Sequence, residues 1–175
     1  DILDLATVDA GIMQLDMTRI ELPMLIDEVV GLIDARFREN AIKLDIQIDK
    51  EAEVMTADAQ RLKQILFKLL SNAANYAPEG SVVQLSCRRE GDEIAFSVSD
   101  NGPGIPSDIL KTVFDRFETH SGTGRRSGAG LGLSIVDSFV SLHNGTVTVS
   151  SDEGSGTNVV CRLPSTPPLP SQAAE

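Results

Sequence analysis

Apolar residues recur along the chain at two spacings, and each spacing predicts one kind of element. Recurrence every three or four residues predicts helices over residues 1–15, 23–40, 58–76 and 131–143. Alternation of apolar and polar residues predicts strands over residues 42–48, 54–57, 81–89, 93–99, 145–151 and 157–163. A short extended segment at 14–21 and a short helix from Ser107 complete the prediction.

The order of these elements predicts the fold class. Helices and strands do not alternate strictly, as they do in a doubly wound parallel sheet, and two pairs of strands are joined by short turns at 90–92 and 152–156. We therefore expect an α+β fold, a two-layer sandwich in which a mixed sheet packs on helices on one face. Residues 16–164 form one domain in this prediction, and residues 165–175, which are rich in proline and lack periodicity, form a disordered tail.

The balance of charge narrows the range of partners. The chain has 175 residues, a net charge of −11 and an isoelectric point near 4.6. Such an acidic chain repels phosphate backbones, so nucleic acid is not expected as a partner. No apolar run reaches the roughly 18 residues that a membrane helix needs. Two cysteines, Cys87 and Cys161, are too few for a disulfide framework, so a reducing, cytoplasmic setting is expected.

Four short stretches carry candidate chemistry. Asn72 lies on the polar face of a predicted helix, where its amide oxygen could bind Mg²⁺, although an asparagine near a helix end is more often solvated or capping. Residues 100–106 follow a strand and hold two glycines, which suits either close approach to a ligand or a plain turn. Segments 128–133 and 154–157 are rich in glycine, and the first leads into a helix whose backbone amides could bind phosphate.

In this order and at these spacings, the stretches resemble the ATP-binding catalytic domain of sensor histidine kinases, in the GHKL superfamily that includes gyrase-type ATPases. The residues around Asn72 resemble the N box of that family. Four further stretches resemble its other boxes: residues 100–104 (first glycine box), 113–117 (F box), 128–132 (second glycine box) and 154–157 (third glycine box). The resemblance covers about residues 18–164 and implies the Bergerat-type ATP-binding fold. Residues 1–15 resemble the end of the second dimerisation helix, whose stripe of Ile2, Leu5 and Val8 would face a helical bundle.

The resemblance implies a binding site for ATP and Mg²⁺. Asp100 would bind the adenine amino group with support from Thr157, Tyr76 would pack beside the base, and Gly104 would allow its close approach. Asn72 would hold Mg²⁺, and residues 118–129 would form a lid whose following glycine amides bind phosphate. The implied site residues are Asn72, Asn75, Tyr76, Asp100, Gly102, Gly104, Ile105, Phe117, Gly128, Gly130, Leu131, Gly132, Leu133 and Thr157.

Three departures from the family pattern bear on activity. Lys68 stands where the family usually has a second Asn, and an ammonium group cannot bind a metal, although it could contact a phosphate instead. Asn75 stands where many members have Lys or Arg. The phosphoacceptor box, a His followed by an acidic residue, is absent from this sequence, and neither His120 nor His143 is expected to be catalytic.

One leading function and two alternatives follow. The leading function is the ATP-binding domain of a two-component sensor histidine kinase, which presents the γ-phosphoryl group of ATP to a His on the dimerisation domain for relay to a response regulator or phosphotransfer partner. The first alternative is a non-catalytic regulatory domain, as in the DivL type of alphaproteobacterial kinase homologue, in which Tyr replaces the acceptor His. The second is a gyrase- or chaperone-type ATPase, which is weaker because Lys68 stands where those enzymes use a Glu base.

The same resemblance sets expectations about assembly and location. The parent protein is expected to be a homodimer, whereas this chain is expected to be monomeric because the 1–15 stripe lacks its partner helices. We expect a bacterial, cytoplasmic protein with no direct insertion into a membrane, and any membrane anchor would lie upstream of residue 1.

Overall fold

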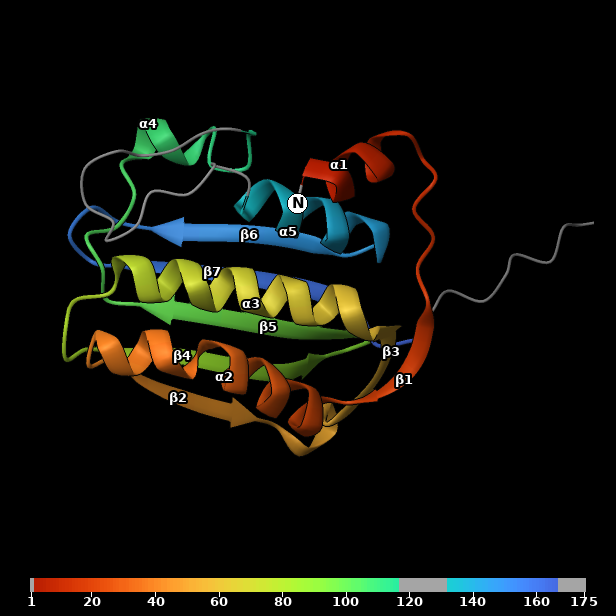
Figure 1. Cartoon of the computed structure of the whole chain (residues 1–175), viewed down its shortest axis with the longest axis horizontal. Helices are drawn as coiled ribbons and strands as arrows, with labels where there is room; N and C mark the ends of the chain where they lie inside the picture. Colours follow the sequence, from red (N-terminus) through yellow and green to blue (C-terminus); the bar gives the residue numbers. More distant parts are fainter. Residues whose placement is uncertain (1, 117–131, 167–175) are drawn as a thin grey trace, which may run out of the picture.

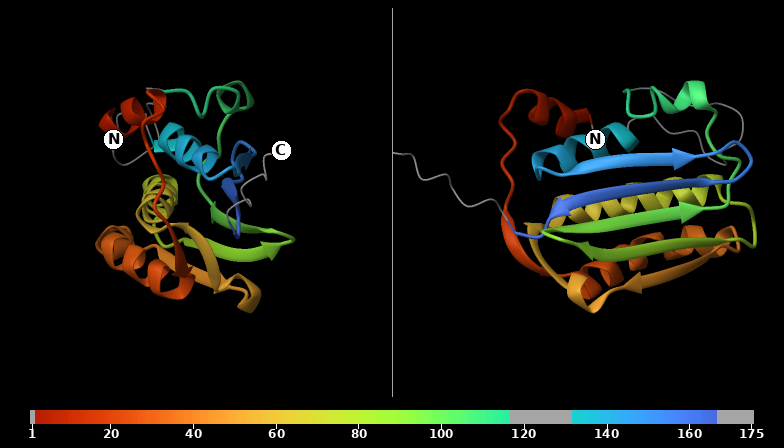
Figure 2. Two further views of the ribbon diagram at one scale, coloured as in Figure 1. Left: turned by 90° about the vertical axis from the view of Figure 1, so that its right-hand side faces the viewer. Right: turned by 180° about the vertical axis from the view of Figure 1, so that it is seen from behind.

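The computed structural model describes residues 2–116 and 132–166. Its two layers are a mixed sheet and a set of helices that cover one face of that sheet (Figure 1). The main helices are α2 (Leu22–Glu39), α3 (Ala59–Tyr76) and α5 (Gly132–Leu142), and the side view in Figure 2 places them on the same side of the sheet. The predicted α+β sandwich is confirmed.

Within the described residues, five strands form the main sheet in the order β2 (Lys43–Ile48), β4 (Val82–Glu90), β5 (Glu93–Asp100), β7 (Thr157–Pro164) and β6 (Thr146–Ser151). β2 pairs with β4 in parallel, and the other pairings in this sheet are antiparallel. The two predicted hairpins, β4–β5 and β6–β7, are both present. The parallel pair requires a crossover, which the chain makes through β3 and α3.

Alternating side chains on the central strands fill the space between the layers. The inward residues of β4 and β5 are buried, and they are Val83, Leu85, Cys87, Ile94, Phe96 and Val98. These residues and the apolar faces of α2 and α3 belong to one core cluster, which explains why both helices show apolar residues every three or four positions. The helical contribution to the core is Leu25, Ile26, Val29, Ile33, Phe37, Leu62, Ile65, Leu66, Leu69 and Leu70.

The N-terminal segment is held against the same domain. β1 (Met17–Glu21) and β3 (Val54–Asp58) form a separate antiparallel pair, and α1 (Ile2–Asp9) packs against α5. Leu5 is buried, whereas Ile2 is 69% exposed and Ile12 is 68% exposed. The helix predicted over 1–15 is therefore too long, because it ends at Asp9. Of its apolar stripe, Leu5 packs into this domain's own core.

The remaining described elements are the short helices η1 (Lys50–Ala52) and α4 (Ser107–Leu110). At the C-terminal end, Ser165 is buried, and its amide and hydroxyl both donate to the carbonyl of Asp92, at 2.8 and 2.9 Å. The predicted tail boundary at residue 165 is therefore too early, because the domain includes Ser165 itself. Of the helices in the described part of the chain, none is long and apolar enough to cross a membrane.

Candidate functional site

Three strand ends and one helix end meet at one edge of the sheet. β5 and β6 end there, β7 begins there, and the C-terminal end of α3 lies on the same side, at the left of Figure 1. Asp58 caps the N-terminus of α3, where its carboxylate accepts a hydrogen bond from the Arg61 amide at 3.0 Å, and the helix ends at Tyr76, two residues before Pro78. A rigid edge of this kind holds polar side chains and loops in fixed positions.

Asp100 is the last residue of β5. Its Oδ1 accepts a hydrogen bond from the Gly102 amide at 2.7 Å, and the backbone of Thr157 also donates to its carboxylate. Burial raises the pKa of Asp100 above the ordinary aspartate value, and these two hydrogen bonds offset part of the increase. An ionised carboxylate held in this way accepts hydrogen bonds from a ligand that offers N–H groups, which is the role predicted for Asp100 toward adenine.

Two glycines let the loop after β5 meet the turn before β7. Gly104 (φ +74°) and Gly156 (φ +88°) both have left-handed backbones. A Cβ on Gly104 would lie 2.1 Å from the carbonyl oxygen of Asp152, and a Cβ on Gly156 would lie 2.0 Å from that of Asp100. Both glycines therefore allow the two backbones to pack against each other, because any side chain at either position would force the two loops apart.

Ser151 lies at the centre of this junction and was not among the predicted site residues. Its hydroxyl accepts a hydrogen bond from the Ile105 amide at 2.8 Å and donates one to the Gly156 carbonyl at 2.7 Å. Its Oγ also lies 3.1 Å from Oγ1 of Thr157, the residue directly opposite it in the β6–β7 pair. The signal that could have found it is its position as the last strand residue before a glycine-rich turn.

The end of α3 reaches the same junction. A Cβ on Gly102 would lie 2.9 Å from the carbonyl oxygen of Tyr76 and 2.7 Å from Oδ1 of Asp100, so the loop backbone fits between helix and carboxylate. Gly102 is buried, and Tyr76 is half-buried. The structure therefore brings together six predicted residues: Tyr76, Asp100, Gly102, Gly104, Ile105 and Thr157.

The polar face of α3 carries the residues of the predicted metal end. Asn72, Asn75 and Lys68 are each half-buried, and Lys68 lies one helical turn before Asn72. Burial lowers the pKa of Lys68, and the nearby carboxylate of Asp4 on α1 offsets part of that decrease. Asp4 also pairs with Arg61 of α3 at 3.0 Å. Helix α1 therefore brings a negative charge to the face that holds Lys68, an arrangement that the sequence did not indicate.

The described part of the second glycine box is the start of α5. Gly132 and Leu133 are half-buried there, and Leu133 packs against the core. Backbone amides at a helix N-terminus suit a phosphate group. The other predicted residues of this region, which are Phe117, Gly128, Gly130 and Leu131, lie outside the described residues, as do His120 and the predicted lid at 118–129.

His143 is a structural residue, as predicted. Its ring is buried, Nε2 accepts a hydrogen bond from the Asp58 amide at 3.1 Å, and Nδ1 donates one to the Phe139 carbonyl at 2.7 Å. Both ring nitrogens are therefore engaged with backbone groups, and the ring joins the end of α5 to the start of α3. Neither nitrogen is left to take part in proton or phosphoryl transfer.

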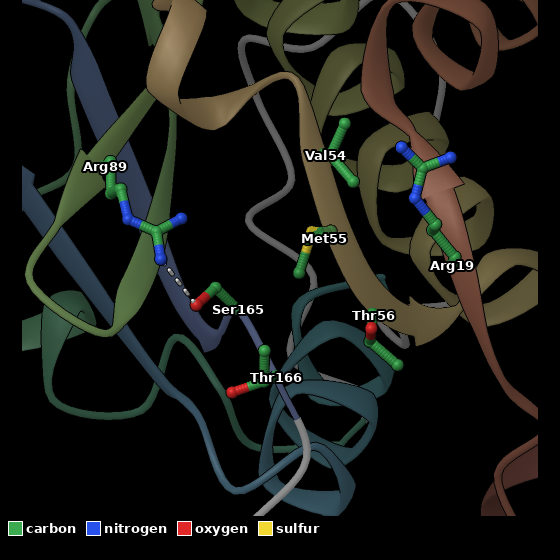
Figure 3. Close-up of a pocket in the computed structure, with 7 residues that line it drawn as sticks. All are labelled: Arg19, Val54, Met55, Thr56, Arg89, Ser165 and Thr166. Atoms are coloured by element: carbon green, nitrogen blue, oxygen red, sulfur yellow. Dashed lines mark hydrogen bonds between the residues drawn. The ribbon is translucent and has the colours of Figure 1, made fainter.

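A second concave region lies away from this edge, between β3 and the chain after β7. This open hollow has a volume of about 270 Å³. In Figure 3, Arg19 and Arg89 lie on opposite sides of Met55. Arg89 donates to the Ser165 hydroxyl at 3.2 Å and to the Glu51 carbonyl at 3.3 Å, so its guanidinium ties together two loops. No predicted site residue lines the hollow. The hydrogen bonds of Arg89 to Ser165 and Glu51 give this residue a structural role.

The donor set limits how a metal ion could be held. The described residues contain no group of three or more His, Cys, Asp or Glu side chains that could bind one. Mg²⁺ at Asn72 would therefore take one amide oxygen from the protein and its other ligands from phosphate and water, which is a usual arrangement for nucleotide-bound Mg²⁺. Asn72 fits that arrangement, whereas the charge of Lys68 opposes it.

Comparison with known proteins agrees with this geometry. Residues 57–167 match the family described as histidine kinase-, DNA gyrase B-, and HSP90-like ATPase. Sensor protein DivL of Caulobacter vibrioides is 37% identical over 169 residues, which cover 95% of this chain and 21% of that protein. Hybrid signal transduction histidine kinase D of Dictyostelium discoideum is 34% identical over 176 residues, which cover 95% of this chain and 11% of that protein.

Solved structures show the same likeness. Full-length ShkA in complex with AMPPNP matches with a TM-score of 0.82 and 28% identity, over 93% of this chain and 34% of that one. The nucleotide-free catalytic domain of histidine kinase ThkA matches with a TM-score of 0.76 and 29% identity, over 87% of this chain and all of that one (100%). The chain therefore belongs to the family of histidine kinase-, DNA gyrase B- and HSP90-like ATPases, as a domain of the type that sensor histidine kinases carry.

Proposed function

We propose that this chain binds ATP with Mg²⁺ and presents the γ-phosphoryl group to a histidine on the dimerisation domain of a two-component sensor kinase. The observation that carries the proposal is the junction at Asp100, where a half-buried carboxylate lies beside Thr157 between two closely packed turns. Membership of the family and the likeness to ShkA, solved with AMPPNP, support the same conclusion.

The residues of the chain divide the task between the two ends of the nucleotide. Asp100, when ionised, accepts hydrogen bonds from the adenine amino group, and Thr157 lies beside it. The amides at the start of α5 face the phosphates, and Mg²⁺ at Asn72 would supply positive charge against the phosphate oxygens. The protein thus binds and orients ATP, while the nucleophile is the histidine of the dimerisation domain.

The partners follow from the same proposal. ThkA was solved in complex with the response regulator protein TrrA, and this chain matches that ThkA structure with a TM-score of 0.74 and 25% identity, over 95% of this chain and 47% of that one. We propose a response regulator or phosphotransfer protein as the partner of a homodimeric, cytoplasmic parent. Residues 1–15 would be the end of its second dimerisation helix.

A non-catalytic regulatory domain is the second candidate, and one observation favours it. Lys68 replaces an uncharged family residue one turn from Asn72, and its ammonium group repels a metal ion there. The 37% identity to sensor protein DivL agrees with the resemblance from which this alternative was drawn. In this case the domain would act through contacts to another kinase or to a response regulator.

Calorimetry of nucleotide binding tests the proposal. ATP and ADP are titrated with and without Mg²⁺ into this chain and into its Asp100→Asn variant. We expect Mg²⁺-dependent binding of ATP, which Asp100→Asn reduces about 100-fold or more: the Gly102 amide would hold the remaining carbonyl oxygen, so that the NH2 group, a donor, would face the adenine amine. Asp108→Asn, an exposed change of the same kind in α4, is the matched control and leaves the affinity unchanged.

Two outcomes contradict the kinase proposal in different ways. Binding of ATP that ignores Mg²⁺ would show that the adenine end works without the metal end, which favours the regulatory candidate. Absence of any binding by the folded wild-type chain would remove the nucleotide site altogether.

A further inference from the structure

Helix α1 is attached to the domain at both of its ends. Leu5 in its middle is buried, and the helix lies against α5 (Figure 2). Near its start, Oδ1 of Asp4 accepts a hydrogen bond from the Arg61 guanidinium at 3.0 Å. At its end, both carboxylate oxygens of Asp9 accept from the Arg116 guanidinium, at 2.6 and 2.7 Å. These contacts hold α1 between α3 and the chain around Arg116.

The pair of Asp4 and Arg61 is partly shielded from water. Their side chains are 24% and 19% exposed. The Arg61 guanidinium also donates to the Gln64 side chain at 2.7 Å, and it lies over the Phe139 ring, 5.1 Å from the ring centroid. A half-buried pair of charges is screened by salt much less than a pair at the surface. The carboxylate of Asp4 is therefore held at a fixed position on the polar face of α3.

That position is close to Lys68. Arg61 and Lys68 lie seven residues apart, which places them on the same face of α3, two turns from each other. The Asp4 charge raises the pKa of Lys68 and so offsets part of the decrease that burial causes. Lys68 in turn lies one turn before Asn72, where the proposed site has Mg²⁺ and the phosphates of ATP. Docked α1 thus brings a carboxylate to the phosphate end of that site.

A carboxylate at this place opposes a bound triphosphate. It repels the phosphate charges, and it neutralises part of the Lys68 charge that would attract them. Because Asp4 and Lys68 are both half-buried, these effects are larger than they would be between surface charges. The docked position of α1 is therefore most stable when the site is empty, and the affinity for ATP is highest when α1 has moved away.

We propose that α1 is a built-in competitor of the nucleotide phosphates: docked α1 sets Asp4 against Lys68, and ATP and docked α1 each weaken the binding of the other. This inference rests on the proposed function and adds a means of regulation to the same site, because whatever moves α1 changes the affinity for ATP. It gives Lys68 a partner in both states, which is Asp4 in the empty site and phosphate in the occupied one. Coupling of this kind is reciprocal, so ATP must loosen α1 by the factor by which docked α1 weakens ATP binding.

The test measures the ATP affinity of the wild-type chain and of Asp4→Asn by calorimetry, with and without Mg²⁺. Asparagine keeps the size of the side chain and removes its charge. We expect the affinity for ATP without Mg²⁺ to rise about threefold to tenfold. The rise should be smaller with Mg²⁺, because the cation offsets the phosphate charge. An affinity in Asp4→Asn that equals that of the wild type, or falls below it, would overturn the proposal.

Three further variants separate the position of α1 from the loss of one charge. Asp27→Asn removes an equal charge from an exposed position of α2 and should leave the affinity unchanged. Leu5→Ala keeps every charge but weakens the docking of α1, so it should raise the ATP affinity as Asp4→Asn does. In a Lys68→Asn background the gain from Asp4→Asn should shrink, because the shared partner is gone.

The results of these variants decide the role of α1. An equal gain from Asp4→Asn in both backgrounds, or no gain in Leu5→Ala, would overturn α1 as a competitor. Thermal unfolding shows whether Leu5→Ala is folded. If it is not, Leu5→Val weakens the same packing less and must raise the ATP affinity in the same direction.

Amide exchange tests the reciprocal effect and keeps this inference separate from the proposed function. Saturating ATP should speed the exchange of amides within α1 of the wild-type chain, by a factor similar to the gain in ATP affinity of Leu5→Ala. A folded wild-type chain that binds no ATP would overturn the proposed function and this inference together. Binding of ATP that leaves amide exchange in α1 unchanged would overturn this inference alone.

Discussion

The two ends of the candidate site are built in different ways. At the proposed adenine end, Asp100 accepts hydrogen bonds from the backbone amides of Gly102 and Thr157, and the Ser151 hydroxyl contacts the Gly156 carbonyl at 2.7 Å and Thr157 Oγ1 at 3.1 Å. At the metal end, Asn72 and Lys68 lie on one face of a single helix, and an acidic residue of α1 lies beside Lys68.

The difference separates geometry that depends on the backbone from geometry that depends on side-chain charge. A Cβ on Gly104 or Gly156 would lie only about 2 Å from a backbone carbonyl oxygen, so these turns tolerate almost no substitution. The proposed adenine end must therefore keep these glycines to keep its shape. A helix face keeps its shape when its side chains change, so the metal end can acquire a lysine without loss of the fold. Changes at the two ends should therefore have unequal effects.

The largest effect is expected from Gly156→Ala at the adenine end. A left-handed alanine costs about 1–2 kcal/mol, and its Cβ would also collide with the Asp100 carbonyl. We expect the free energy of unfolding to fall by about 2–4 kcal/mol in urea titrations, and ATP binding to be lost. Gly31→Ala in α2 is the control: nothing lies near its Cβ, and stability should rise by about 0.5–1 kcal/mol. Equal effects of the two variants would contradict this account.

A smaller effect is expected from pH, again at the adenine end. Because burial raises the pKa of Asp100, its carboxylate becomes protonated at a higher pH than an exposed aspartate does. ATP affinity should fall as the pH falls through this raised pKa, by about tenfold per pH unit below it. The contribution of Asp100 to the stability of the nucleotide-free protein changes in the opposite direction. It increases as the pH falls through the raised pKa, because protonation removes a buried charge from the folded state.

Calorimetry of ATP binding from pH 7 to below the ordinary aspartate pKa measures the first trend, and thermal unfolding without nucleotide measures the second. In Asp100→Asn the contribution of this group to the pH dependence of stability should vanish. A wild-type affinity that stays constant even below the ordinary aspartate pKa would exclude Asp100 as the acceptor for adenine.

The smallest effect is expected from Lys68→Asn at the metal end. Loss of the ammonium charge removes both its repulsion of Mg²⁺ and its attraction for phosphate. We expect a few-fold fall in ATP affinity without Mg²⁺ and a few-fold larger gain from adding Mg²⁺. Lys63→Asn, which removes an equal charge from α3 beside Glu28, should change neither quantity. Identical ATP affinities for Lys68→Asn and wild type, with and without Mg²⁺, would mean that the Lys68 charge acts on neither the phosphates nor the metal ion.

The sequence predicted the strands that carry Asp100 and Thr157, because apolar and polar residues alternate clearly along both. Asp100 ends one of these strands and Thr157 begins the other, and both strands lie within one residue of their predicted bounds. Ser151 was not predicted because a serine at the end of a strand carries no distinctive signal, although it lies on the same half-buried face of β6 as Val147 and Val149. Its role depends on three partners that only the folded sheet brings together.

The errors at the chain ends have a similar origin. The apolar period of 1–15 predicted one helix, but Gly11 has a left-handed backbone beyond the end at Asp9, and Leu5 is buried in the domain instead of facing outward. Ser165 precedes a proline-rich stretch and therefore looked disordered, yet its carbonyl accepts the Thr56 amide at 2.8 Å. The contact of α1 with the Lys68 face is tertiary, and no local pattern encodes it.

The sheet also contains its own chemical probe of unfolding. Cys87 and Cys161 stand on either side of Phe96 in one row across β4, β5 and β7, and burial raises the pKa of both thiols to about 12. A thiol that is neither accessible nor ionised does not react with an alkylating reagent at neutral pH. The rate at which the native chain takes up such a reagent therefore reports how often the central sheet opens, with no label or mutation added.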